Sequence, residues 1–221
     1  MATQNSELRI NNSKLIVCSW LLSLGLFLTG TGGAFLPWIW RAGVALQLTA
    51  PGLAEFVKFL PEVRSGQVQI ERLFFMLPLF LAMLALPLFA TNQTLRVPMW
   101  LRWLMRLAVI PLALASLSPV WTPAILVAPE FRLQTLLAAT AVGLAVIAPL
   151  FKRLPLRILI ILLVVGDLAA LTLPLWQFSL IQAGVGEAYH QPISLGWGWW
   201  FTVGGIVMTV VGGVWTTIVS R

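Results

Sequence analysis

Ile158 to Trp176 reads ILIILLVVGDLAALTLPLW, an apolar run with a single ionisable side chain, Asp167. A bilayer core about 30 Å thick is crossed by a helix of about 20 predominantly apolar residues. The run therefore predicts a membrane-spanning helix, and five further runs have the same character. We predict an all-α integral membrane protein, a six-transmembrane-helix bundle, with spans at about 15–36, 73–90, 101–118, 133–151, 158–176 and 199–219.

The composition is typical of a chain whose solvent is lipid. Hydrophobic residues make up 59% and charged residues 10% of the chain, whereas a soluble domain carries about 25% charged residues. The runs are continuously apolar rather than alternating, which argues against membrane-spanning strands. We expect residues 1–221 to form one transmembrane domain in contact with the lipid bilayer, with bound lipid and no other cofactor.

Basic residues are concentrated in alternate loops. If the N-terminus is inside, the inner segments hold nine of the 14 Lys and Arg residues and the outer segments hold five. The positive-inside rule then predicts that both termini are cytoplasmic. The compact loops favour the plasma (inner) membrane of a prokaryote. The net charge of +7 is thus explained without nucleic acid. The inner residues are Arg9, Lys14, Arg96, Arg102, Arg106, Lys152, Arg153, Arg157 and Arg221; the outer are Arg41, Lys58, Arg64, Arg72 and Arg132.

The first outer loop contains a short amphipathic pattern. Its apolar residues recur at helical spacing from Leu53 to Leu60, with charged residues on the other side. We predict an amphipathic surface helix at 51–63, too short and too charged to span, that lies on the outer membrane surface or caps the bundle. It serves either as a lid over the helix ends or as a partner-docking loop through Phe56, Lys58 and Phe59.

Small residues recur at every fourth position in three runs. Such faces let another helix approach closely, and threonine can hydrogen-bond across the contact. The faces serve contacts within the bundle or contacts with a second protein. They are Gly25, Thr29 and Gly33 in the first run, Gly205, Thr209, Gly213 and Thr217 in the sixth, and Thr135, Ala139 and Gly143 in the fourth.

Prolines interrupt the second and third runs. Pro78 and Pro87 are expected to kink or loosen the second helix, because proline removes a helical hydrogen bond. The third run carries Pro111, and we expect its helix to end near Ser118, before a proline-rich outer turn through Pro129.

Asp167 is the candidate buried polar site. Placing a charged side chain at the bilayer centre costs about 2.5–3.5 kcal/mol on insertion scales, so this residue should face the interior and find a partner. It would serve either as a proton, cation or substrate site, or as a structural interhelical hydrogen bond. No second buried charge is evident in the sequence to complete a relay.

Catalytic and metal-binding patterns are missing from the sequence. There is no His-Glu-x-x-His, Gly-x-Ser-x-Gly or Gly-x-x-x-x-Gly-Lys motif, so we expect no enzymatic activity. Cys18 is the one cysteine and is expected to pack as a small residue. His190 is the one histidine and a weak candidate for a metal ligand with Glu187; a surface role is the alternative.

These features predict a non-enzymatic integral subunit of a larger membrane protein complex, with a scaffolding or stabilising role. Its expected partners are other integral membrane subunits. The alternative is a transporter, or its substrate-binding subunit, for a small apolar or cationic solute with Asp167 in the path.

Overall fold

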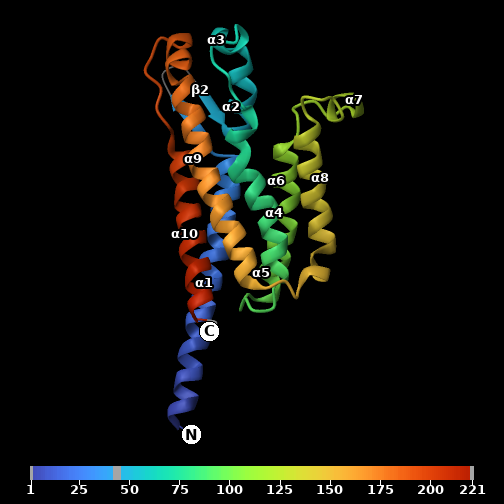
Figure 1. The fold of residues 1–221 in the computed structure, drawn as a ribbon, viewed down its shortest axis with the longest axis vertical. Helices are drawn as coiled ribbons and strands as arrows, with labels where there is room; N and C mark the ends of the chain where they lie inside the picture. Colours follow the sequence, from blue (N-terminus) through green and yellow to red (C-terminus); the bar gives the residue numbers. More distant parts are fainter. Residues whose placement is uncertain (1, 42–45, 220–221) are drawn as a thin grey trace.

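The computed structural model describes residues 2–41 and 46–219. Within them, six helices are long and apolar enough to cross a membrane, and they stand together in one bundle (Figure 1). The apolar stretches are Asn12–Ala34, Arg72–Thr91, Met99–Ser116, Arg132–Phe151, Leu156–Ala188 and Trp197–Val219. This arrangement confirms a helical bundle of the kind expected for a multi-pass membrane protein.

The elements follow the chain in a simple order. Arg221, one of the basic residues assigned to the inner side, lies outside the described residues. The elements are α1 (Ala2–Ala34), β1 (Pro37–Arg41), β2 (Leu46–Thr49), α2 (Ala50–Phe56), η2 (Val57–Phe59), α3 (Pro61–Arg64), η3 (Arg72–Met76), α4 (Leu77–Thr91), α5 (Met99–Leu107), α6 (Val109–Ser116), α7 (Pro123–Leu126), α8 (Arg132–Ile147), η4 (Ala148–Phe151), α9 (Leu156–Ala188) and α10 (Trp197–Val219).

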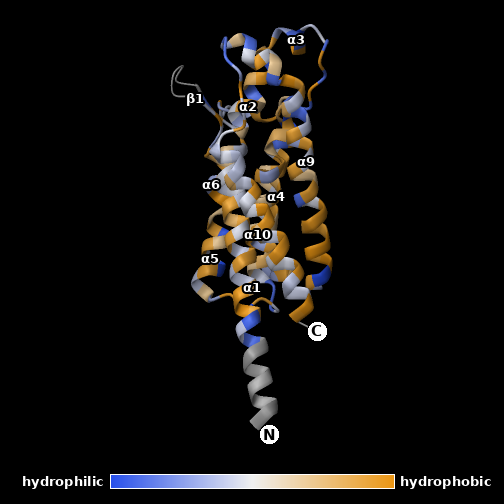
Figure 2. Cartoon of the chain, turned by 90° about the vertical axis from the view of Figure 1, so that its left-hand side faces the viewer, coloured by the Kyte–Doolittle hydropathy of each residue, from blue (hydrophilic) through white to orange (hydrophobic). Residues whose placement is uncertain are grey.

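The bundle has two distinct ends. The hairpin end carries β1, β2, α2, α3 and α7, and the opposite, terminal end carries the loops at 92–98 and 152–155 and the end of α10 (Figure 1). Figure 2 shows that apolar residues dominate the helices between the two ends, while hydrophilic residues are more frequent around α3 at the hairpin end. This distribution fits a molecule whose middle lies in lipid and whose ends lie at the two surfaces.

Helix α4 is the centre of the bundle. It packs against α1, α5, α6, α8 and α9, and 67% of its apolar stretch is buried, the largest share among the six spans. Pro78 lies in the first turn, where its missing N–H has no helical partner to lose. Pro87 lies inside the helix, and the Thr91 hydroxyl donates to its carbonyl at 3.3 Å. The helix continues past Pro87 to Thr91.

The third span is divided into α5 and α6. The break falls at Ala108, three residues before Pro111, which has no N–H to donate to the carbonyl of Leu107. The helix ends at Ser116, two residues earlier than expected, and α7 interrupts the proline-rich turn that follows.

The hairpin end differs from the sequence prediction in two ways. Strands β1 and β2 pair antiparallel, with Ile39 opposite Leu48, an element that the all-α prediction did not include. The predicted helix at 51–63 is divided into α2, η2 and α3, because Pro61 restarts the chain in a new direction after an extended Leu60. The pieces bury Leu53 and Val57 in the bundle core.

Helix α9 is longer than the apolar run that predicts it. It continues from Trp176 to Ala188 and has 33 residues in all. The extension keeps a helical apolar stripe, since Phe178, Ile181 and Val185 are buried. The helix therefore reaches the hairpin end, where it packs against η3 and the segment around Glu62.

Candidate functional site

The closest helix contact joins the first and last spans, α1 and α10. A methyl group on Gly25 would lie 2.5 Å from Thr209 Oγ1, and one on Gly205 would lie 2.5 Å from the Thr29 nitrogen. Such distances leave no room for a side chain, so glycine is required on both helices. The predicted small residues Gly25, Thr29, Gly205 and Thr209 thus meet one another within the chain.

The α10 side of this contact is built from a repeated Gly-x-x-x-Thr unit. Each threonine hydroxyl donates to the carbonyl of the glycine four residues earlier, at 2.9, 2.8 and 2.6 Å. These bonds satisfy the hydroxyl groups inside their own helix. Units repeated every seven residues keep one face toward a packed neighbour over several turns. The pairs are Gly198 with Thr202, Gly205 with Thr209, and Gly212 with Thr216, all buried.

The remaining predicted packing residues lie on other faces. Gly33 faces α4, where a methyl group would lie 3.0 Å from the Leu79 nitrogen. Gly213 faces Ile160 of α9, and the hydroxyl of Thr217 donates to the Val214 carbonyl at 2.7 Å. The contact with α1 passes through Gly212 and Thr216 instead, because the face follows a spacing of three and four residues in alternation rather than four throughout.

The small-residue face of α8 is open at two of its three predicted residues, while the hydroxyl of the third, Thr135, is buried. Ala139 is exposed, and a methyl group on Gly143 would meet no atom within 4 Å. Helix α8 also has the least buried apolar stretch of the six spans, at 22%. The small residues of α1 and α10 therefore pack against each other, whereas no described helix covers Ala139 and Gly143 of α8.

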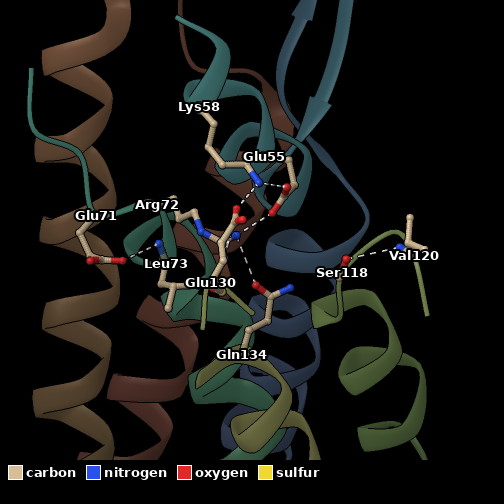
Figure 3. A network of polar contacts seen from close by, with 9 residues as sticks. All are labelled: Glu55, Lys58, Glu71, Arg72, Leu73, Ser118, Val120, Glu130 and Gln134. Carbon is tan, nitrogen blue, oxygen red and sulfur yellow. Dashed lines mark hydrogen bonds and ion pairs between the residues drawn. The ribbon is translucent and has the colours of Figure 1, made fainter. Parts of the chain in front are cut away.

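A polar network at the hairpin end connects α2 and η3 with the start of α8 (Figure 3). The Lys58 ammonium pairs with Glu55 and Glu130, each at 2.5 Å, and the Arg72 guanidinium pairs with Glu55 at 2.6 Å. Arg72 also donates to the Glu130 carbonyl and to the Gln134 side-chain oxygen. Two cations and two anions therefore neutralise each other in one cluster.

Phe131 completes this network from the loop before α8. The Lys58 nitrogen lies 5.1 Å and the Arg72 guanidinium carbon 4.9 Å from the centre of its ring. Both distances are within the range of cation–π attraction. The ring and the carboxylates hold the two cations in place, so the network fixes α2 and η3 against α8.

The charges of the network shift each other's titration. The hydrogen bond from Lys58 lowers the pKa of Glu130 below its ordinary value of 4.5. Desolvation acts to lower the pKa of Lys58, but the hydrogen bonds that Lys58 donates to Glu130 and Glu55, together with the negative charges of these carboxylates, outweigh it and raise that pKa above 10.5. Both shifts favour the charged forms, as expected for an ion-pair network rather than for an acid–base catalyst poised near neutral pH.

The predicted docking residues do not form one surface. Lys58 is held in the network, and Phe56 stacks on Tyr189 with ring centres 5.9 Å apart. Phe59 is 70% exposed and is the residue of this group most available to a partner.

A cavity of about 360 Å³ adjoins the network between α2, α6 and the start of α8. Its walls include Leu114, Leu117 and Trp121, and its polar lining includes Glu55 and Gln134. Because Glu55 is already paired with Lys58 and Arg72, the cavity offers apolar contact with little free charge.

Asp167 is fully buried, as expected for an acid in a span. It shares a face of α9 with Leu163, Ala170 and Pro174, and its neighbour Gly166 contacts Leu81 of α4. Among the described residues, neither carboxylate oxygen has a hydrogen-bond partner. The interhelical hydrogen bond considered from the sequence is therefore not formed within this part of the chain.

His190 ends α9 in a left-handed backbone conformation. Its φ is +53°, and the bonds Gln191 N to Gly186 O and His190 N to Glu187 O form a Schellman cap. Glycine is the usual residue at this position. The side chains of His190 and Glu187 both line an open cavity of about 810 Å³ with Gln182.

In the described part of the chain, no group of three or more His, Cys, Asp or Glu side chains is placed to hold a metal ion.

No protein family, curated protein or solved structure matches this chain. The geometry alone therefore has to support a function.

Several residues of the network were not singled out from the sequence. Arg72, Glu130 and Gln134 lie in other segments than Lys58, and Glu130 is 72 positions away along the chain. The available signal was the balance of acids and bases in the outer segments, which predicts pairing without naming the partners.

Proposed function

We propose that this chain is a non-enzymatic integral subunit of a larger membrane protein complex, with a scaffolding or stabilising role. The open small-residue face of α8 is the observation that carries the proposal. The chain uses the same kind of face to bring α1 and α10 into close contact. In lipid, close packing of small residues is a main source of helix association. A transmembrane helix of a partner subunit is the occupant that suits Ala139 and Gly143.

The ionic network supports a structural role. Its four charged side chains are used up in pairing, and their pKa shifts hold them in their charged forms. An enzyme or a relay would require a group free to exchange protons. We further propose that the membrane is a prokaryotic plasma membrane with the terminal end in the cytoplasm, because seven of the eleven Lys and Arg side chains within residues 12–40 and 47–219 lie there.

Purification from the native membrane in a mild detergent tests the proposal. The wild-type chain should copurify with another integral membrane protein in fixed stoichiometry, identified by mass spectrometry. Gly143→Leu should prevent copurification of this partner, because the leucine side chain would occupy the space where the partner helix packs. Gly204→Leu is the matched control, because Gly204 is also exposed with no atom within 4 Å of an added methyl group. A stable monomer, or equal loss of the partner in both variants, would contradict the proposal.

A second function, transport of a small cationic or apolar solute, is favoured by one observation, the unpartnered carboxylate of Asp167. In that case the purified wild-type chain should retain a small molecule that mass spectrometry detects after denaturation. Asp167→Asn should lose this molecule while folding normally. Retention of the same molecules by both forms would remove the support for transport.

A further inference from the structure

The terminal end carries basic side chains without acidic neighbours. Among residues 12–40 and 47–219, no acidic side chain lies at this end, and the ion pairs of these residues lie at the hairpin end. Positive charge that is not neutralised by acidic side chains attracts anionic head groups at the surface of a membrane. The basic residues of the terminal end are Lys14, Arg96, Arg102, Arg106, Lys152, Arg153 and Arg157.

One open cavity at this end combines apolar and cationic lining residues. It has a volume of about 480 Å³ and lies between α1, the loop at 92–98 and α5. Ile16 and Trp20 form its apolar side on α1, and both are partly exposed where the bundle meets lipid. Arg96 and Arg102 supply its cationic side. An apolar wall beside two guanidinium groups suits a molecule with an acyl part and an anionic head.

The loop that carries Arg96 is held rigidly. Its backbone nitrogen donates to Ser19 Oγ of α1 at 3.1 Å, and Leu95 and Val97 on either side are buried. The Asn92 side chain fastens the start of the loop, since it accepts from Thr94 N at 3.0 Å and donates to Leu154 O at 3.1 Å. The backbone of Arg96 is therefore held against α1, and its exposed side chain extends from a defined point of the loop.

Arg102 has a different part in the cavity. Its guanidinium donates to the carbonyls of Val97 at 3.1 Å and Leu95 at 3.0 Å. It thus shapes the loop and places a fixed positive charge behind Arg96. Trp20 in the same lining contacts Trp100, with ring centres 5.7 Å apart and ring planes inclined by 54°. Tryptophan is common at the level of the head groups, where its ring meets lipid and its N–H meets water.

We propose that the cavity formed by Ile16, Trp20, Arg96 and Arg102 binds the phosphate head group of an anionic phospholipid. The apolar wall of the cavity contacts the glycerol and upper acyl region of the same lipid. The site lies at the opposite end of the bundle from the ionic network and does not depend on the subunit proposal.

Native mass spectrometry of the purified chain tests this site, with phosphatidylglycerol as the probe and phosphatidylcholine as its zwitterionic counterpart. We expect one tightly retained phosphatidylglycerol and no equivalent phosphatidylcholine. Arg96→Gln should weaken phosphatidylglycerol binding about fivefold, the contribution of one basic residue at an anionic surface. Arg153→Gln, which removes the same charge from the same end outside the cavity, should leave it nearly unchanged.

Four results would overturn the proposal. Equal retention of the two lipids would show that the head-group charge is not recognised. Equal weakening by Arg96→Gln and Arg153→Gln would show diffuse attraction rather than a site. Competition by millimolar inorganic phosphate as strong as that by phosphatidylglycerol would assign the cavity to a free phosphate. A photoactivatable phosphatidylglycerol should attach within residues 93–102 or near Trp20, and attachment elsewhere would also contradict the site.

Discussion

Gly204 and Gly205 are neighbours in the sequence that face different surroundings. A methyl group on Gly205 would lie 2.5 Å from the backbone of α1, whereas one on Gly204 would meet nothing within 4 Å. We expect Gly205→Ala to destabilise the fold by about 1–3 kcal/mol, the usual cost of overpacking. Gly204→Ala should leave stability unchanged or slightly raised, since alanine favours a helix. Thermal unfolding in detergent measures both, and equal midpoints would contradict the close contact.

The backbone of His190 leads to an unusual prediction, that removing its side chain stabilises the protein. A left-handed conformation costs a residue with a Cβ about 1–2 kcal/mol. His190→Gly should therefore raise the free energy of unfolding, by about 1 kcal/mol after the larger chain entropy of glycine is counted. His190→Ala is the control, because it removes the imidazole and keeps the strain. A stabilising alanine variant would assign the effect to the imidazole instead.

At the scale of elements, the network joins segments that the bilayer alone would not order. Residues 50–76 connect strand β2 with α4. Lys58 and Arg72 of this segment bind Glu130 and Gln134 at the start of α8. Arg72 has only 11% of its side chain exposed, so its pairing acts in a less polar setting than a surface ion pair. The network thus sets the position of α8, the helix with the open face.

The titration of this network predicts how stability depends on pH. Because the folded-state pKa of Glu130 lies below 4.5, its pairing stabilises the fold above that pH and is lost as the pH falls through the folded value. Because the pKa of Lys58 is raised above 10.5, its contribution persists below 10.5 and is lost only at still higher pH. Unfolding midpoints should therefore be insensitive to this pair between about pH 5 and 10.

Glu130→Gln tests this dependence. The variant should lose less stability than the wild type as the pH falls below 4.5. The difference should be under about 1 kcal/mol, since 48% of the Glu130 side chain is exposed and solvent screens the pair. Glu187→Gln alters an acid outside the network and should keep the wild-type acid response. Identical acid responses of wild type and Glu130→Gln would show that the pair contributes nothing.

At the scale of the whole molecule, an even number of spans places the two termini on one side of the membrane. Cys18 is the sole cysteine and is buried, so a Cys18→Ser background allows single cysteines to report sidedness. Phe59→Cys should react with an impermeant maleimide added to intact cells. Lys152→Cys should react only after the cells are opened. The reverse pattern would invert the proposed orientation.

The six spans were predictable because lipid imposes a single strong requirement, continuous apolar length, that local sequence records. The ends of the helices were harder to predict from the sequence. Helix α9 continues beyond Trp176 because Ile181 and Val185 find protein to pack against, which a search for apolar runs does not detect. Strands β1 and β2 were missed because Trp38 and Trp40 are also typical of a membrane border.

The candidate site shows the same division. The glycines and threonines of α1 and α10 were visible as a pattern, but their mutual contact depends on which helices become neighbours. The ionic network could not be predicted from the sequence, because residues as distant as Lys58 and Glu130 meet only after the bundle forms. Asp167 was identified as buried, and its lack of a partner among the described residues could not be foreseen.

The pairing of α1 with α10 has a consequence for the order in which the protein is made. Helix α1 is synthesised before α10, so α1 enters the bilayer without this neighbour while the intervening residues are made. During this time the small residues Gly25 and Thr29 have no α10 to pack against. The contact between α1 and α10 can thus form only after the other described spans have been made, and a chain truncated before α10 leaves this face of α1 unfilled.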